Sequence, residues 1–138
     1  MPAGKTAEDR DDIELLFDNL PEPIDLELDS DTETLYWTDR GDFPKGNTLN
    51  KADVSALLGS KESNSNYSIL ARHLHEAIGL KVDDVHKHIY VTDLGGCVYR
   101  YHMDGSNRVK LFEGQGVYTG IALSHLESED AKKLYGIE

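Results

Sequence analysis

The stretch His73-Leu74-His75-Glu76 contains the residue types of this sequence that most readily support chemistry. Two imidazoles and a carboxylate within four residues can donate hydrogen bonds to a phenol or a ketone, or move a proton. The alternative interpretation is a polar loop with two solvated histidines. A metal site is disfavoured here, because His73 and His75 alternate in direction if the chain is extended and no third ligand is obvious.

Arg40 is the second candidate, and it lies in a segment with Asp42, Phe43 and Pro44. A cation in this position could meet an electron-rich or anionic oxygen, or it could form a salt bridge with Asp39 or Asp42. The sequence supports both roles of Arg40 equally. His86 and His88 fall in a predicted turn between two strands, away from these candidates, and we interpret them as surface residues.

Several reaction classes are disfavoured by the sequence. No nucleophile and base pair is discernible, and Gly95-Gly96 alone indicates a turn and not a phosphate-binding loop. Covalent hydrolysis and nucleotide chemistry are therefore disfavoured, and we expect no cofactor. A calcium-dependent lactonase would need Asp and Asn side chains that converge on one point, which a sequence does not show.

Composition and charge limit the partners. The chain has 138 residues with 14 Lys and Arg against 26 Asp and Glu, a formal net charge of −12. Such a surface repels phosphate backbones and anionic lipids, so we expect neither nucleic acid nor a membrane as partner. No apolar stretch approaches the length of a membrane helix. The polar start without a signal pattern and the single cysteine, Cys97, favour the cytoplasm.

An internal repeat sets the architecture. Asp29 and Asp83 are 54 residues apart, and Tyr36 and Tyr90 are separated by the same interval. Each repeat alternates apolar and polar residues in short runs with turn residues between them, which predicts four strands per repeat. The predicted strands span 24–28, 35–38, 48–53 and 68–72 in the first repeat, and 78–82, 89–92, 97–102 and 109–112 in the second.

Further segments extend this pattern. A third copy begins at 119–124 and reaches 134–137, and Ile13–Phe17 is placed as the outer strand of a preceding blade. Residues 55–66 of the first repeat form an insertion with loop or short-helix character. The prediction is thus a disordered acidic tail over 1–12 and one all-β domain over 13–138, a partial β-propeller of about two to three blades.

The motifs also carry a family resemblance. Leu35-Tyr36-Trp37-Thr38-Asp39 resembles the YWTD signature of six-bladed propellers of the low-density-lipoprotein-receptor class, and Ile89-Tyr90-Val91-Thr92-Asp93 is a variant of it. Met103-Asp104-Gly105-Ser106 is similar to the Leu-Asp-Gly-Ser strand end of that family. The resemblance implies that Tyr36, Trp37 and Tyr90 pack between blades, and that Asp39 and Asp93 pin adjacent blades or contact substrate.

The chain departs from the receptors because it has neither a signal nor cysteine pairs. It looks more like intracellular fungal propellers, some of which are similar to hetero-Diels-Alderases of tropolone sesquiterpenoid pathways. That resemblance implies a cofactor-free enzyme of secondary metabolism that joins a quinone methide to a terpene alkene in the channel. The loops at one channel end supply the candidates. The predicted catalytic residues are His73, His75, Arg40 and Tyr118, and the predicted substrate-binding residues are Asp39, Glu76, Asp93 and Thr119.

The chain is too short to form a closed six-bladed ring by itself. Six blades of about 40 to 45 residues need roughly twice this chain. We therefore expect a homo-oligomer in which copies complete one another, with a dimer favoured and a trimer of two blades per copy as the alternative. The competing functional interpretations are a non-catalytic scaffold that binds a protein or small ligand, and a degenerate fragment of a longer propeller.

Overall fold

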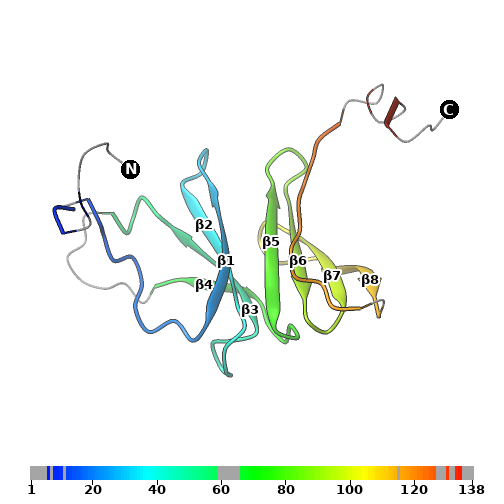
Figure 1. Ribbon diagram of the computed structural model, residues 1–138, viewed down its shortest axis with the longest axis horizontal. Coiled ribbons are helices and arrows are strands. Elements are labelled where there is room, and N and C mark those ends of the chain that lie inside the picture. Colours follow the sequence, from blue (N-terminus) through cyan, green and yellow to red (C-terminus); the bar gives the residue numbers. More distant parts are fainter. Residues whose placement is uncertain are drawn as a thin grey trace.

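The computed structural model describes residues 6, 8–10, 12–58, 66–114, 116–126, 130 and 133–134. Most of the predicted tail over 1–12, the middle of the predicted insertion and nearly all of the predicted strand over 134–137 lie outside this part of the chain. Within it, the strands form two four-stranded antiparallel sheets, each in sequential order. The fold is all-β, and the two sheets are consecutive blades of a partial propeller (Figure 1).

Blade 1 follows the first repeat. Its strands are β1 (Pro23–Asp29), β2 (Thr34–Asp39), β3 (Thr48–Asp53) and β4 (Ser68–Ala71). Blade 2 follows the second repeat, with β5 (Ala77–Asp83), β6 (His88–Asp93), β7 (Cys97–His102) and β8 (Val109–Glu113). All eight strands predicted from alternation and turn chemistry are confirmed to within two residues at each end.

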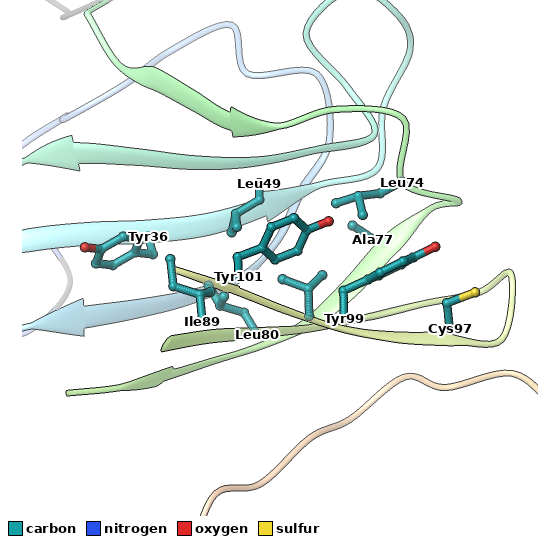
Figure 2. Packing of buried hydrophobic residues seen from close by; sticks show 10 residues of the cluster. Tyr36, Leu49, Leu74, Ala77, Leu80, Ile89, Cys97, Tyr99 and Tyr101 are labelled. Atoms are coloured by element: carbon teal, nitrogen blue, oxygen red, sulfur yellow. The ribbon is translucent and has the colours of Figure 1, made fainter. Parts of the chain in front are cut away.

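The two blades pack face to face around one apolar core. Tyr36 and Leu49 of blade 1 meet Leu80, Ile89 and Tyr101 of blade 2 in this core (Figure 2). All of them are buried, because side chains alternate across a strand and these positions point to the partner blade. The predicted packing of Tyr36 between blades is confirmed.

The innermost strands β1 and β5 lie side by side (Figure 1). The Asp25 carboxylate accepts a hydrogen bond of 2.9 Å from the Leu80 amide, and Lys81 forms an ion pair with Glu27. The buried Thr38 hydroxyl accepts from the Asp25 amide at 3.3 Å and donates to the Ile78 carbonyl at 2.8 Å. The threonine of the YWTD motif therefore connects one inner strand to the next.

The outer face of blade 1 is covered by a second cluster. Trp37 contacts the Phe17 ring at a centroid distance of 5.3 Å and the Tyr67 ring at 5.0 Å. The strand predicted over 13–17 is wrong, because these residues have no strand conformation and Leu16 and Phe17 instead pack against Trp37. Trp37 thus packs on the side away from blade 2.

Residues 119–124, which were predicted to form the third inner strand, have no strand conformation, but they do lie next to blade 2. This segment forms no ladder in the described residues, yet it runs beside blade 2 (orange in Figure 1). The Thr92 hydroxyl accepts from the Gly79 amide at 3.0 Å and donates to the Thr119 carbonyl at 3.1 Å, as Thr38 does one repeat earlier. A Cβ atom at residue 79 would lie 2.5 Å from that carbonyl, so the approach requires glycine.

Among the described residues, no helix has both the length and the apolar character needed to span a membrane.

Candidate functional site

The candidate site lies at the end of the blades where the loop before β1, the β2–β3 loop and the β4–β5 loop meet. Leu74 is buried in the core, and its exposed neighbours His73 and His75 flank it. The anchored leucine forces both imidazoles toward solvent, since the residues alternate around it. His73 and Glu76 have positive φ angles of 60° and 54°, so the backbone on both sides of His75 is held in a sharply turned conformation.

A hollow of about 270 Å³ opens beside these histidines. Phe43, Pro44 and Leu74 supply apolar surface, and His73 and His75 supply polar groups at its rim. Neither imidazole has a hydrogen-bond partner among the described residues, so both remain able to donate to a bound molecule. An apolar hollow with a few polar groups is the usual form of a small-molecule site.

Asn47 holds this loop together and was missed by the sequence analysis. Its carbonyl accepts from the Leu74 amide at 3.2 Å, and its side chain accepts from the Glu76 amide at 2.8 Å and donates to the Gly41 carbonyl at 3.2 Å. Its φ of 54° is a conformation that asparagine tolerates better than most residues. An asparagine directly before a predicted strand was the available signal.

Arg40 forms a salt bridge, but not with the predicted partners. Its Nη2 lies 2.8 Å from Glu22 Oε1, its Nε donates to the same oxygen at 2.8 Å, and its Nη1 lies 4.0 Å from Glu76 Oε2. The expected pairing with Asp39 or Asp42 is wrong, because Arg40 lies beside the loop before β1 and that loop supplies Glu22. Arg40 is therefore linked to the histidine loop through Glu76.

The side chains of Asp39 and Asp93 are fully buried, and their carboxylate oxygens accept hydrogen bonds from backbone amides. Asp39 accepts from Glu22 and Gly41 at 3.1 and 2.9 Å, and Asp93 accepts from His75 and Cys97 at 3.1 and 2.9 Å. Burial raises the pKa of Asp39, although the two amide hydrogen bonds act in the opposite direction. Both carboxylates hold the loops that surround the site, and neither faces the hollow.

Tyr118 and Thr119 lie further along the same end, next to blade 2. Tyr118 is half-buried, and Thr119 is exposed with its carbonyl bound to Thr92. The structure places His73, His75 and Glu76 on the β4–β5 loop, and Arg40 of the β2–β3 loop reaches this group only through Glu76. It does not bring Tyr118 or Thr119 into contact with that group within the described residues.

Comparison with solved structures supports the β-propeller fold. The solved structure of a nidogen/laminin complex has a TM-score of 0.56 to this chain at 23% identity, over 71% of this chain and 35% of that one. That likeness shows the fold of the chain, which is that of β-propeller blades. No protein-family model matches the sequence.

The chain is also similar in sequence to two fungal proteins. The chain is 46% identical over 129 residues to the 3-hydroxyacyl-CoA dehydrogenase-like protein LAM1 of Cochliobolus heterostrophus, over 90% of this chain and 27% of that protein. It is 44% identical over 124 residues to the low-density lipoprotein receptor-related protein 1 of Pyricularia oryzae, over 88% of this chain and 40% of that protein. The chain thus spans well under half the length of both relatives.

Proposed function

We propose that the chain supplies two blades to a YWTD propeller ring whose loop end binds a small, oxygenated, mostly apolar compound. The observation that carries this proposal is the hollow of about 270 Å³, with Phe43, Pro44 and Leu74 on its walls and, at its rim, two imidazoles that have no hydrogen-bond partner among the described residues. Apolar walls favour an apolar ligand by excluding water, and the imidazoles favour a ligand with a carbonyl or phenol oxygen.

The reaction that we propose for this site is a hetero-Diels-Alder addition, which follows from the fungal resemblance. A quinone methide and an alkene form one C–O bond and one C–C bond, and no atom leaves and no electron is supplied from outside. Holding the two reactants together contributes about 7 to 11 kcal/mol in favourable cases. His73 and His75 would donate to the carbonyl oxygen as it gains negative charge. Arg40 and Tyr118, the other two predicted donors, do not line this hollow, and Arg40 binds Glu22.

The second candidate is a non-catalytic scaffold that binds a protein or peptide. It is favoured by the shape of the neighbouring surface, where two shallow hollows of about 420 Å³ each adjoin Glu76. One is lined by Glu22, Arg40 and Asp42, and Phe43 is 81% exposed nearby. An exposed aromatic ring surrounded by charged side chains is typical of a protein contact.

Saturation-transfer NMR with a set of phenols and aryl ketones tests the proposal. Binding to the wild-type protein should be weakened about tenfold in the double variant His73→Ala/His75→Ala, since two neutral hydrogen bonds contribute about 1 to 3 kcal/mol. His102→Ala is the matched control, because His102 is exposed at the other end of blade 2. Product formation from a quinone methide and a humulene-type alkene then tests the reaction.

The outcomes separate the two candidates. Small-molecule binding that survives the double variant would place the ligand elsewhere and overturn the site. A wild-type protein that binds none of the compounds would favour the scaffold. Binding without product formation would keep the ligand site and remove the proposed reaction.

We further propose that the remaining blades come from additional copies of the chain, with a dimer favoured and a trimer as the alternative. Both outward blade faces support this proposal. Leu26 and Leu28 on β1 are 65% and 55% exposed, and Phe112 on β8 is 59% exposed. Apolar side chains in these positions are covered in a closed ring, so the faces are suited to association.

A further inference from the structure

A second group of ligating side chains lies at the end of blade 2 away from the loop site. Asp83 ends β5, His86 follows in the β5–β6 turn, and His125 arrives from the segment after β8. His86 Nδ1 lies 2.9 Å from Asp83 Oδ2, and His125 Nε2 lies 3.4 Å from Asp83 Oδ1. One atom from each residue lies within 4.8 Å of the other two. Residues 39 positions apart thus converge on one carboxylate.

The equivalent turn of blade 1 shows what is particular to this one. There Asp29 Oδ2 accepts a hydrogen bond of 2.7 Å from the Thr32 hydroxyl, and the Asp31 amide donates to Asp29 Oδ1 at 3.1 Å. Blade 2 keeps the aspartate and its amide bonds but has His86 where blade 1 has Thr32. A hydroxyl is sufficient to close the turn, so the imidazole adds a metal ligand that the turn itself does not need.

The Asp83 carboxylate is well suited to a cation. It is 2% exposed, and the Val85 and His86 amides hold it in place from one side. Each of the two carboxylate oxygens faces an imidazole nitrogen.

We propose that Asp83, His86 and His125 bind a divalent transition-metal ion, with Zn²⁺ as the expected ion, and that the metal clips residues 119–126 to blade 2. Imidazole with carboxylate is a ligand set that zinc accepts, and three protein ligands leave a fourth position for water. Zinc bonds of about 2.0 to 2.2 Å in tetrahedral geometry place ligand atoms about 3.4 Å apart. The two imidazole nitrogens lie 2.9 and 3.4 Å from different oxygens of Asp83, and one ligand atom from each of the three residues lies within 4.8 Å of the other two. The rings of His86 and His125 are partly exposed with centroids 5.5 Å apart, so they have room to rotate toward a shared ion.

Zinc titration of the untagged protein, followed by competition with a chromophoric chelator, tests the proposal. We expect one Zn²⁺ per chain in the wild-type protein and at least a tenfold loss of affinity in His86→Thr and in His125→Ala. His86→Thr restores the residue that blade 1 uses at this position, so its turn should still fold. The double variant His73→Ala/His75→Ala is the matched control and should bind zinc as the wild-type protein does.

Hydrogen exchange provides a readout that a simple hydrogen-bonded turn would not change. Added Zn²⁺ should slow exchange of the amides in residues 119–126 in the wild-type protein and leave them unchanged in His86→Thr. The proposal is overturned if the wild-type protein binds no zinc, if both single variants bind it with wild-type affinity, or if zinc leaves exchange of this segment unaltered.

Discussion

At the residue scale, the pKa values of two aspartates in the same repeat are shifted in opposite directions. The hydroxyl of Thr32 donates to Asp29 and lowers the pKa of that carboxyl, although burial partly offsets the effect. Asp39 is buried at the other end of the blade, and burial raises its pKa. The difference arises because a short hydroxyl hydrogen bond stabilises the charged form of Asp29, whereas desolvation dominates at Asp39.

This contrast predicts opposite pH dependences of stability. The ionised Asp29 stabilises the fold above about pH 4, and this contribution is lost as the pH falls through its lowered folded pKa. The stability difference between the wild-type protein and Asp29→Asn should therefore shrink in acid. The charged form of Asp39 is destabilised in the folded state by burial. The stability of the wild-type protein relative to that of Asp39→Asn should therefore rise as the pH falls from neutral toward 4. Urea unfolding of the three proteins across this pH range measures both differences, and parallel pH profiles would contradict the assignment.

The candidate site could be predicted only in part from the sequence. His73, His75 and Glu76 were recognisable because they are neighbours in the chain, and the structure keeps them on one loop. The grouping of Asp83, His86 and His125 was not recognisable, because only the fold brings His125 to that turn. The ion pair between Arg40 and Glu22 was missed for the same reason. Side chains far apart in the sequence meet through blade packing, which local patterns do not encode.

At the element scale, the hydroxyl of the YWTD threonine joins neighbouring inner strands. Thr38 and Thr92 make the same pair of hydrogen bonds one repeat apart, but their acceptors differ in setting. Thr38 donates to Ile78 in the strand β5, whereas Thr92 donates to the exposed Thr119, which has no ladder. Substitutions at Thr38 and Thr92 can therefore be compared to measure how much this hydrogen-bonded contact contributes to the free energy of unfolding.

Replacing Thr38 with valine should destabilise the fold by about 1 to 3 kcal/mol, because the shape is kept while the Asp25 amide and the Ile78 carbonyl lose their partner. Thr92→Val should cost less, since water reaches the Thr119 carbonyl more easily. Chemical denaturation with a linear extrapolation measures both changes in the free energy of unfolding. A larger cost for Thr92→Val would show that the third segment is held more firmly than its exposure indicates.

The elements themselves were the most predictable part of the molecule. Alternation and turn chemistry gave all eight strands, because each of them has a neighbouring strand close in sequence to pair with. The two segments predicted wrongly, 13–17 and 119–124, carry apolar residues typical of a strand but have no ladder partner among the described residues. A strand pattern predicts the capacity to pair, and pairing requires a second strand.

At the scale of the whole molecule, the two blades leave both flanking faces open to association. Trp37, the single tryptophan, lies at a hollow of about 300 Å³ that is also lined by Phe17, Ile24 and Leu26. Its indole N–H is buried and has no partner in the described part of the chain. A buried donor without an acceptor is costly. Ile24 and Leu26 are 42% and 65% exposed, so this face gains stability if another blade covers its apolar side chains.

We therefore predict that the chain associates through its open faces, and that its melting temperature rises with protein concentration. Light scattering should give a mass of two or three times 15.4 kDa. Each copy carries a net charge of −12, so association should strengthen as salt rises from about 0.05 to 0.5 M and screens the repulsion. Leu26→Glu/Leu28→Glu should give a monomer, whereas Val85→Glu, at a position that is 64% exposed in the β5–β6 turn, should not. A wild-type monomer with a concentration-independent melt would show that copies of this chain do not complete the ring.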